Sequence, residues 1–203
     1  MVVRPARPWL TVAIALLAGL AWALPALSEL LIYDRALLFK GQIWRAWTGH
    51  AVHYGSSHVF WNLAVFIPVG CWLERLWPAM ARWYYLVSPL VISAALLVFD
   101  PTLIRYAGLS GMATGMLVLL AGLQLRRRPA EPAWFWLAVI GLVAAKIVIE
   151  LISGAPLLVS KGDFAGIRHV PLAHIAGVAC AAAFWLWAVA APGRVIAGRD
   201  RLP

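Results

Sequence analysis

A serine and a histidine stand near the starts of two long apolar segments, where polar side chains are rare. Ser110 lies in the run Gly-Leu-Ser-Gly at 108–111, and His174 lies in Ala-His-Ile-Ala-Gly at 173–177. A serine becomes a nucleophile when a neighbouring base takes its proton, and histidine is the usual base because its pKa lies near neutrality. Polar residues inside apolar helices are costly and tend to be functional. Ser110 and His174 are therefore candidates for nucleophile and general base.

Two further polar residues, His58 and Asn62, could stabilise the negative charge that such an attack creates. They are four positions apart, so on a helix both point to the same side. The oxygen of an attacked carbonyl needs hydrogen-bond donors aimed at it. The backbone N–H of Ser110, close to the start of a helix, is a third candidate donor.

Glycines follow both candidate residues at the spacing that lets helices approach closely. Gly111 and Gly115 form one small-xxx-small face, and Gly177 with Ala181 forms another. Gly108 precedes the serine and belongs to the same group of supporting residues. Close contact between these two faces would bring the serine and the histidine within hydrogen-bond reach.

The charged pair Lys146 and Glu150 is spaced i, i+4 in an apolar segment. Such a pair could serve as a proton or ion relay, but we favour a neutralised structural pair near the outer end of its helix.

No Asp or Glu is expected to orient His174. We therefore predict a Ser-His dyad, not a three-part arrangement with a carboxylate.

The remaining histidines raise the alternative of a metal site. His50, His53 and His169 are predicted to lie on the same side as the two histidines named above. No HExxH motif and no acidic cluster accompanies them, so we expect no metal ion and no organic cofactor. His53 and Tyr54 are interpreted as loop residues near the entrance of the site.

The elements that must position these residues are membrane helices. Of the 203 residues 64% are hydrophobic and only 12% are charged, and the mean hydropathy of +0.85 excludes a water-soluble domain. The net charge of +9 comes from basic residues in short segments between the apolar runs, which indicates membrane orientation and no nucleic-acid partner. Cys71 and Cys180 lie inside apolar runs and are interpreted as core residues.

Six stretches are apolar and long enough, or nearly so, to cross about 30 Å of hydrocarbon as helices. We predict an all-α, polytopic six-helix bundle forming one domain over 1–203, with an interfacial first loop at 28–56. The predicted helices are 9–27, 57–77, 83–99, 109–125, 133–152 and 171–191.

The positive charges favour both termini in the cytoplasm, because more Arg and Lys then fall on the inner side, including the triplet 126–128. The second, fourth and sixth helices then start at the outer face. All four candidate residues therefore share one depth near that face, in what we expect to be a bacterial inner membrane. An alternative for the first helix is a cleaved signal peptide.

The three motifs together resemble those of the rhomboid intramembrane serine proteases. That family carries Gly-x-Ser-Gly at the start of its fourth helix, Ala-His-x-x-Gly in its sixth and His-x-x-x-Asn in its second. Here these motifs stand at 108–111, 173–177 and 58–62, in the same order. One such motif would be weak support, but three at matching helix ends are specific.

Further likenesses extend the resemblance from the first loop to the sixth helix. Trp44-Arg45 resembles the Trp-Arg element of the family's first loop, and Gly70 with Glu74 and Arg75 resembles the end of its second helix.

The resemblance implies Ser110 as nucleophile, His174 as general base, and His58 and Asn62 as oxyanion stabilisers. One position departs from the pattern: Thr114 stands where rhomboids often carry a tyrosine that stacks on the base. Thr114 could hydrogen-bond instead.

Within the family, the chain is similar to the rhombosortases, through its compact form and the run Val-Pro-Leu-Ala-His-Ile-Ala-Gly at 170–177. This implies single-span membrane proteins with a Gly-Gly-containing C-terminal anchor as substrates. Two alternatives stay open: a catalytically inactive relative that binds membrane segments, and a small transporter. The inactive relatives usually lack the serine or the histidine, and a transporter predicts an internal repeat that the sequence does not contain.

Overall fold

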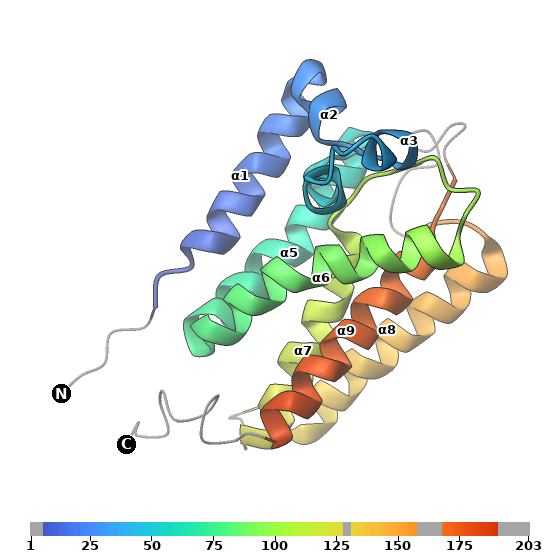
Figure 1. Cartoon of the computed structure of the whole chain (residues 1–203). Coiled ribbons are helices and arrows are strands. Elements are labelled where there is room, and N and C mark those ends of the chain that lie inside the picture. Colours follow the sequence, from blue (N-terminus) through green and yellow to red (C-terminus); the bar gives the residue numbers. More distant parts are fainter. Residues whose placement is uncertain (1–5, 128–130, 158–167, 191–203) are drawn as a thin grey trace.

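A computed structural model describes residues 6–127, 131–157 and 168–190 of the chain. Long helices form at all six predicted places, which confirms the all-α prediction (Figure 1). They are α1 (Trp9–Ala23), α5 (Ser56–Leu76), α6 (Pro78–Phe99), α7 (Ser110–Arg127), α8 (Ala133–Ser153) and α9 (Pro171–Ala190). In Figure 1 the start of α1 and the end of α9 lie at one end of the bundle.

Two proline residues account for the largest differences from the predicted boundaries. The first helix stops at Ala23, and Pro25 begins a second helix, α2 (Pro25–Leu31), bent by 118° from α1. Proline disfavours helical geometry in the residue before it, and Leu24 is accordingly extended. Pro78 opens α6 five residues before the predicted start, because proline suits the first turn of a helix.

By length and hydropathy α5, α6, α8 and α9 are candidate membrane spans within the described residues, and the bent pair α1–α2 would make a fifth. The helix α7 falls outside this group, although it lies among the others. Eleven of its 18 residues are buried, and it contacts α5, α6, α8 and α9. Where a membrane helix is covered by other helices, small and polar residues are accommodated in its contacts, so its mean hydropathy can be lower.

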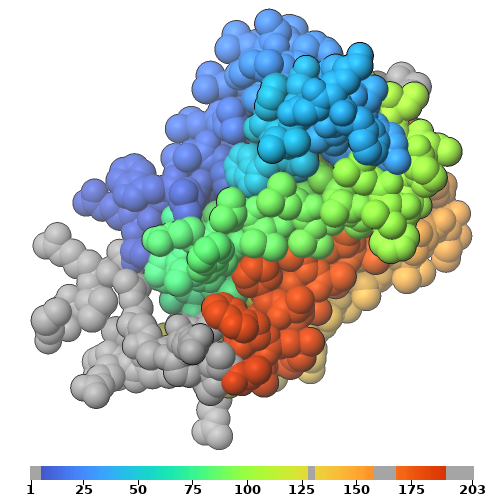
Figure 2. All heavy atoms as spheres, in the orientation of Figure 1, coloured from blue at the N-terminus to red at the C-terminus, as the bar shows by residue number. Residues whose placement is uncertain are grey.

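The segment between α2 and α5 folds into short elements at one end of the bundle (Figure 1). These are β1 (Tyr33–Asp34), α3 (Arg35–Phe39), α4 (Arg45–Thr48) and the 3-10 helix η1 (Gly49–Ala51), with β1 paired antiparallel to β2 (Arg105–Tyr106). In space-filling view this segment packs against α1 and α6 (Figure 2).

Arg45 holds this segment together from a buried position. Its guanidinium donates to the carbonyl oxygens of Glu29 and Ile32, each at 2.8 Å. Trp47 Nε1 donates to the carbonyl of Tyr85 at 3.0 Å and so ties the segment to α6. These contacts give the Trp-Arg element of the sequence a structural role.

At the opposite end, Glu74 in the last turn of α5 caps the start of α1. Its carboxylate accepts from Leu10 N at 3.0 Å, from Thr11 N at 2.9 Å and from Thr11 Oγ1 at 2.8 Å. The first N–H groups of a helix have no partner inside it, so a buried carboxylate satisfies them well.

The helices α7 and α9 pack backbone to backbone through glycines, as the small-residue spacing predicts. A Cβ on Gly111 would lie 2.7 Å from the carbonyl oxygen of Ala173, and one on Gly177 would overlap the carbonyl oxygen of Gly111. A Cβ on Gly115 would likewise overlap the carbonyl of Gly177. No larger residue fits these three positions without moving a helix.

Candidate active site

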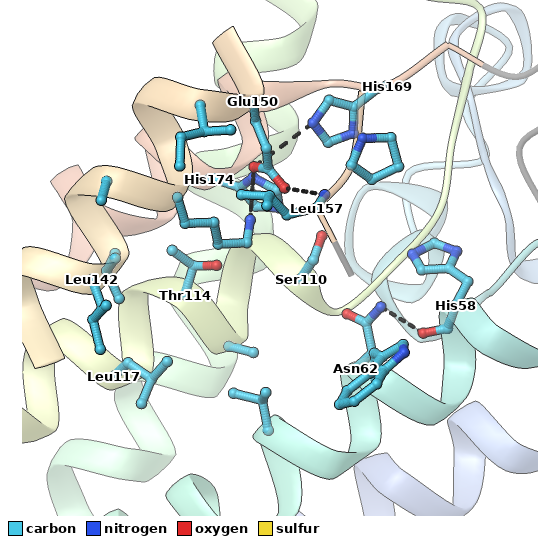
Figure 3. A pocket seen from close by; sticks show the side chains of 18 of the residues that line it. His58, Asn62, Ser110, Thr114, Leu117, Leu142, Glu150, Leu157, His169 and His174 are labelled. Carbon is cyan, nitrogen blue, oxygen red and sulfur yellow. Dashed lines mark hydrogen bonds and ion pairs between the residues drawn. The ribbon is translucent and has the colours of Figure 1, made fainter. Parts of the chain in front are cut away.

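A cavity of about 540 Å³ lies between α5, α7, α8 and α9 and contains all four predicted site residues (Figure 3). Ser110 enters it from the start of α7, His174 from the first turn of α9, and His58 and Asn62 from α5. The structure therefore brings together residues separated by up to 116 positions. Thr114, one turn after the serine, is buried and lines the same cavity.

Gly108 shapes the approach to Ser110. Its φ of +125° is a conformation that residues with a side chain rarely adopt. A Cβ at this position would lie 2.8 Å from His58 Nε2, so the glycine lets the imidazole come close to the turn before α7. Tyr106 supports this turn by donating its hydroxyl proton to the carbonyl of Gly108 at 3.1 Å. Sequence reasoning missed Tyr106, which carries no distinguishing motif.

A carboxylate contacts His174, so the expectation that no Asp or Glu is placed to orient it is wrong. Glu150 Oε2 lies 2.8 Å from His174 Nδ1, and both residues are almost fully buried. Glu150 is in the last turn of α8 and His174 in the first turn of α9, and consecutive antiparallel helices place such turns at the same end. The sequence therefore contained one signal for this contact: both residues fall at the same end of their predicted helices.

Lys146 contacts Glu150, as the i, i+4 spacing predicts, and also contacts His174. Its Nζ lies 2.7 Å from Glu150 Oε2 and 3.1 Å from His174 Nδ1. Lys146 and Glu150 therefore do more than neutralise each other, because both also contact His174, the candidate base. Figure 3 shows Glu150 and His174 of this cluster near Ser110.

Ser110 and His174 point into the same cavity, but no direct hydrogen bond joins them in the described structure. Catalytic hydrogen bonds are often long before substrate binds and tighten in the complex. The backbone contact between α7 and α9 holds the two side chains on facing turns.

Asn62 is oriented differently from what an oxyanion donor requires. Its Nδ2 donates to the carbonyl of His58 at 2.8 Å, and its Oδ1 has no hydrogen-bond partner among the described residues. Figure 3 shows that oxygen on the cavity side. A half-turn of the amide would present Nδ2 to the cavity instead.

The two histidines of the first loop, His50 and His53, are not among the residues that line the cavity. His50 Nε2 hydrogen-bonds the carbonyl of Pro89 at 3.1 Å and Ser93 Oγ at 3.2 Å, and burial lowers its pKa to about 4. His53 lies in a loop, as predicted, and is buried; burial together with the neighbouring His58 lowers its pKa well below the usual value. Both are therefore neutral at pH 7.

Glu150, His169 and His174 offer donor atoms within 4.8 Å of one another, which is the size of a metal site. The sequence argument against a metal, that no HExxH motif and no acidic cluster accompanies the histidines, is thus incomplete, because a single Glu joins two of them. However, the ammonium of Lys146 bonds the same Glu150 oxygen that an ion would use. The carboxylate already has a cationic partner.

The comparisons with known proteins agree with the motifs. The family model described as Rhomboid domain matches residues 40–191, which include every residue of the cavity. A comparison with curated proteins gave no match. The chain therefore belongs to the rhomboid family of intramembrane serine proteases and is a multi-pass integral membrane protein.

Proposed function

We propose that this protein is an active intramembrane serine endopeptidase in which Ser110 is the nucleophile and His174 the general base. The observation that carries the proposal is their position on facing turns of α7 and α9, in one cavity, on helices that glycines hold in contact. Glu150 and Lys146 of α8 contact Nδ1 of His174, so Nε2 is the nitrogen available to Ser110.

The reaction begins when Ser110 Oγ adds to the carbonyl carbon of the scissile bond and its proton passes to His174 Nε2. The oxyanion is stabilised by His58, by the Ser110 backbone N–H and by Asn62 after its amide turns. The C–N bond then breaks as His174 gives the proton to the leaving amine. Water, deprotonated by His174, hydrolyses the acyl-enzyme and restores Ser110.

The walls of the cavity suit a substrate that is itself a membrane segment. Trp61 and Val65 of α5 and Val139, Leu142 and Val143 of α8 line it with apolar side chains. Only three of the 21 residues of α8 are buried, so this helix can move with little loss of packing. We propose lateral entry between α5 and α8, with the scissile bond at Ser110.

The proposed substrates are single-span membrane proteins with a Gly-Gly-containing C-terminal anchor, as in the rhombosortases. The proposed topology has six spans in one rhomboid-like domain, both termini in the cytoplasm and the site near the outer face of a bacterial inner membrane. In its support, α7 starts beside the start of α9, where Gly111 meets Ala173, and ends beside the end of α9, where Arg126 donates to the carbonyl of Ala188. The basic residues Arg126 and Arg127 close α7 on the proposed inner side.

The test is cleavage of a tagged single-span protein with such an anchor in liposomes, by wild type, Ser110→Ala and His174→Ala. Each variant should lose at least about 1000-fold in rate, because neither residue works without the other. Ser153→Ala, an exposed serine of α8, is the matched control and should cleave normally. Cleavage by both site variants at the wild-type rate would refute the protease proposal, and equal cleavage of a Leu-Leu version of the anchor would refute the substrate class.

A further inference from the structure

Glu150 occupies a position that the dyad leaves unexplained. A carboxylate in an apolar helix is costly, yet this one is 2% exposed and faces a histidine that lines the cavity. We infer that Glu150 is the positioning residue of His174, so that Ser110, His174 and Glu150 form a three-part arrangement. The inference rests on the proposed function and adds a residue to its machinery.

The carboxylate of Glu150 is fixed by donors around it. Oε2 lies 2.8 Å from His174 Nδ1 and 2.7 Å from Lys146 Nζ, and Oε1 accepts from Leu157 N at 3.4 Å. Donors from three parts of the chain therefore define its orientation. A group held in this way can in turn define the orientation of the imidazole.

The positions of the charges decide which nitrogen of His174 carries the proton. Nδ1 has two neighbours, the Glu150 carboxylate at 2.8 Å and the Lys146 ammonium at 3.1 Å. If the ammonium donated to Nδ1, the proton of the neutral ring would sit on Nε2, and His174 could not accept a proton from Ser110. If Nδ1–H donates to Glu150, the lone pair of Nε2 is free.

The distances favour the second arrangement. Glu150 Oε2 lies 2.8 Å from His174 Nδ1, nearer than Lys146 Nζ at 3.1 Å, and the ammonium makes its shorter contact, 2.7 Å, with the carboxylate. The carboxylate can accept from both groups at once, because an ionised oxygen has more than one acceptor site. Lys146 thereby keeps Glu150 charged in an apolar setting, and Glu150 holds His174 with Nε2 toward Ser110. The negative charge also stabilises the imidazolium that forms when Ser110 attacks.

The first experiment measures the rate at which a fluorophosphonate labels Ser110 in purified full-length protein, for wild type, Glu150→Gln and Glu150→Asp. Glu150→Gln should label about 100-fold more slowly or worse, because an amide does not enforce the correct tautomer. Glu150→Asp, which keeps the charge, should recover part of the rate.

Glu74→Gln is the matched control. Glu74 is also a buried carboxylate in a membrane helix, but it caps α1 far from the cavity. This variant should lower the melting temperature and label Ser110 within about twofold of wild type, since no cavity residue contacts Glu74. Folded Glu150→Gln protein that labels at the wild-type rate would overturn the inference, and so would an equal loss in Glu74→Gln and Glu150→Gln.

A second measurement reads the tautomer without any reaction. The nitrogen NMR spectrum of wild-type protein with isotope-labelled histidine should show His174 protonated at Nδ1, with the signal assigned by its loss in His174→Gln. Protonation at Nε2 alone would overturn the inference whatever the activity. Protein protonated at Nδ1 that neither labels nor cleaves would instead refute the protease proposal and leave Glu150 as the partner of His174.

Discussion

The helix pair α7–α9 and the helix α8 both contribute to the site, but they are held in opposite ways. In the pair, Gly111, Gly115 and Gly177 bring backbone against backbone. In α8 only Trp136, Val143 and Glu150 are buried. Lipid gives helices no hydrophobic reason to associate, so close packing and polar contacts decide how firmly each is attached.

This difference separates the two tasks of the site. The nucleophile and the base sit on the tightly packed pair, where their relative position is fixed by glycine contacts that tolerate no side chain. Part of the apolar wall of the cavity and the carboxylate that faces His174 sit on the loosely packed helix. A movement of α8 can therefore open the cavity without separating α7 from α9, but it must carry Glu150 with it.

The largest effect is expected from breaking the tight pair. Gly177→Leu would drive a side chain into the Gly111 carbonyl, so it should cost about 3 kcal/mol of stability and abolish labelling of Ser110. The same change in the loose helix, Gly141→Leu, meets nothing within 4 Å. Thermal unfolding in detergent, together with fluorophosphonate labelling, compares the two.

Gly141→Leu should match wild type in both measurements, since its new side chain extends into lipid. Equal destabilisation by both substitutions would show that α8 is packed as tightly as α9, and the comparison would then fail.

Local patterns in the sequence predict most of the fold. Hydropathy locates all six long helices, and the spacing of Gly111, Gly115 and Gly177 predicts the contact between α7 and α9. These features are encoded in neighbouring residues, so they can be read without knowing how the helices are arranged. The bend after Ala23 was missed because the apolar run continues across Pro25 and hydropathy does not detect a change of direction.

The site was predicted only in part for a related reason. Motifs identify Ser110 and His174, and the pair Lys146 and Glu150 is visible from its i, i+4 spacing. The contact between Glu150 and His174 joins two helices, so it depends on their rotation about their own axes. Hydropathy fixes the depth of each residue but not that rotation, and the orientation of the Asn62 amide is set by the carbonyl of His58.

A smaller effect should follow from Lys146→Met, which removes the cationic partner of Glu150. The buried carboxylate would lose a charged hydrogen bond of 2.7 Å, so we expect a loss of about 2 kcal/mol in stability and about tenfold slower labelling of Ser110. Lys146→Arg keeps the charge and should stay nearer to wild type in both. If Lys146→Met labels faster than wild type, the lysine competes with Glu150 for His174 and does not support it.

The smallest effect concerns the wall that α8 contributes to the cavity. Val143 is buried and lines the cavity, whereas Val148 on the same helix is exposed and does not. Val143→Phe should narrow the path of a membrane segment and lower kcat/KM for a single-span substrate about fivefold, the effect of a modest misfit in an apolar pocket. Labelling by a small fluorophosphonate should stay within about twofold, because Ser110 remains accessible. Val148→Phe should change neither rate. A loss of labelling as large as the loss of cleavage would mean that Val143 supports Ser110 and His174 directly, and α8 would then belong with the tight pair.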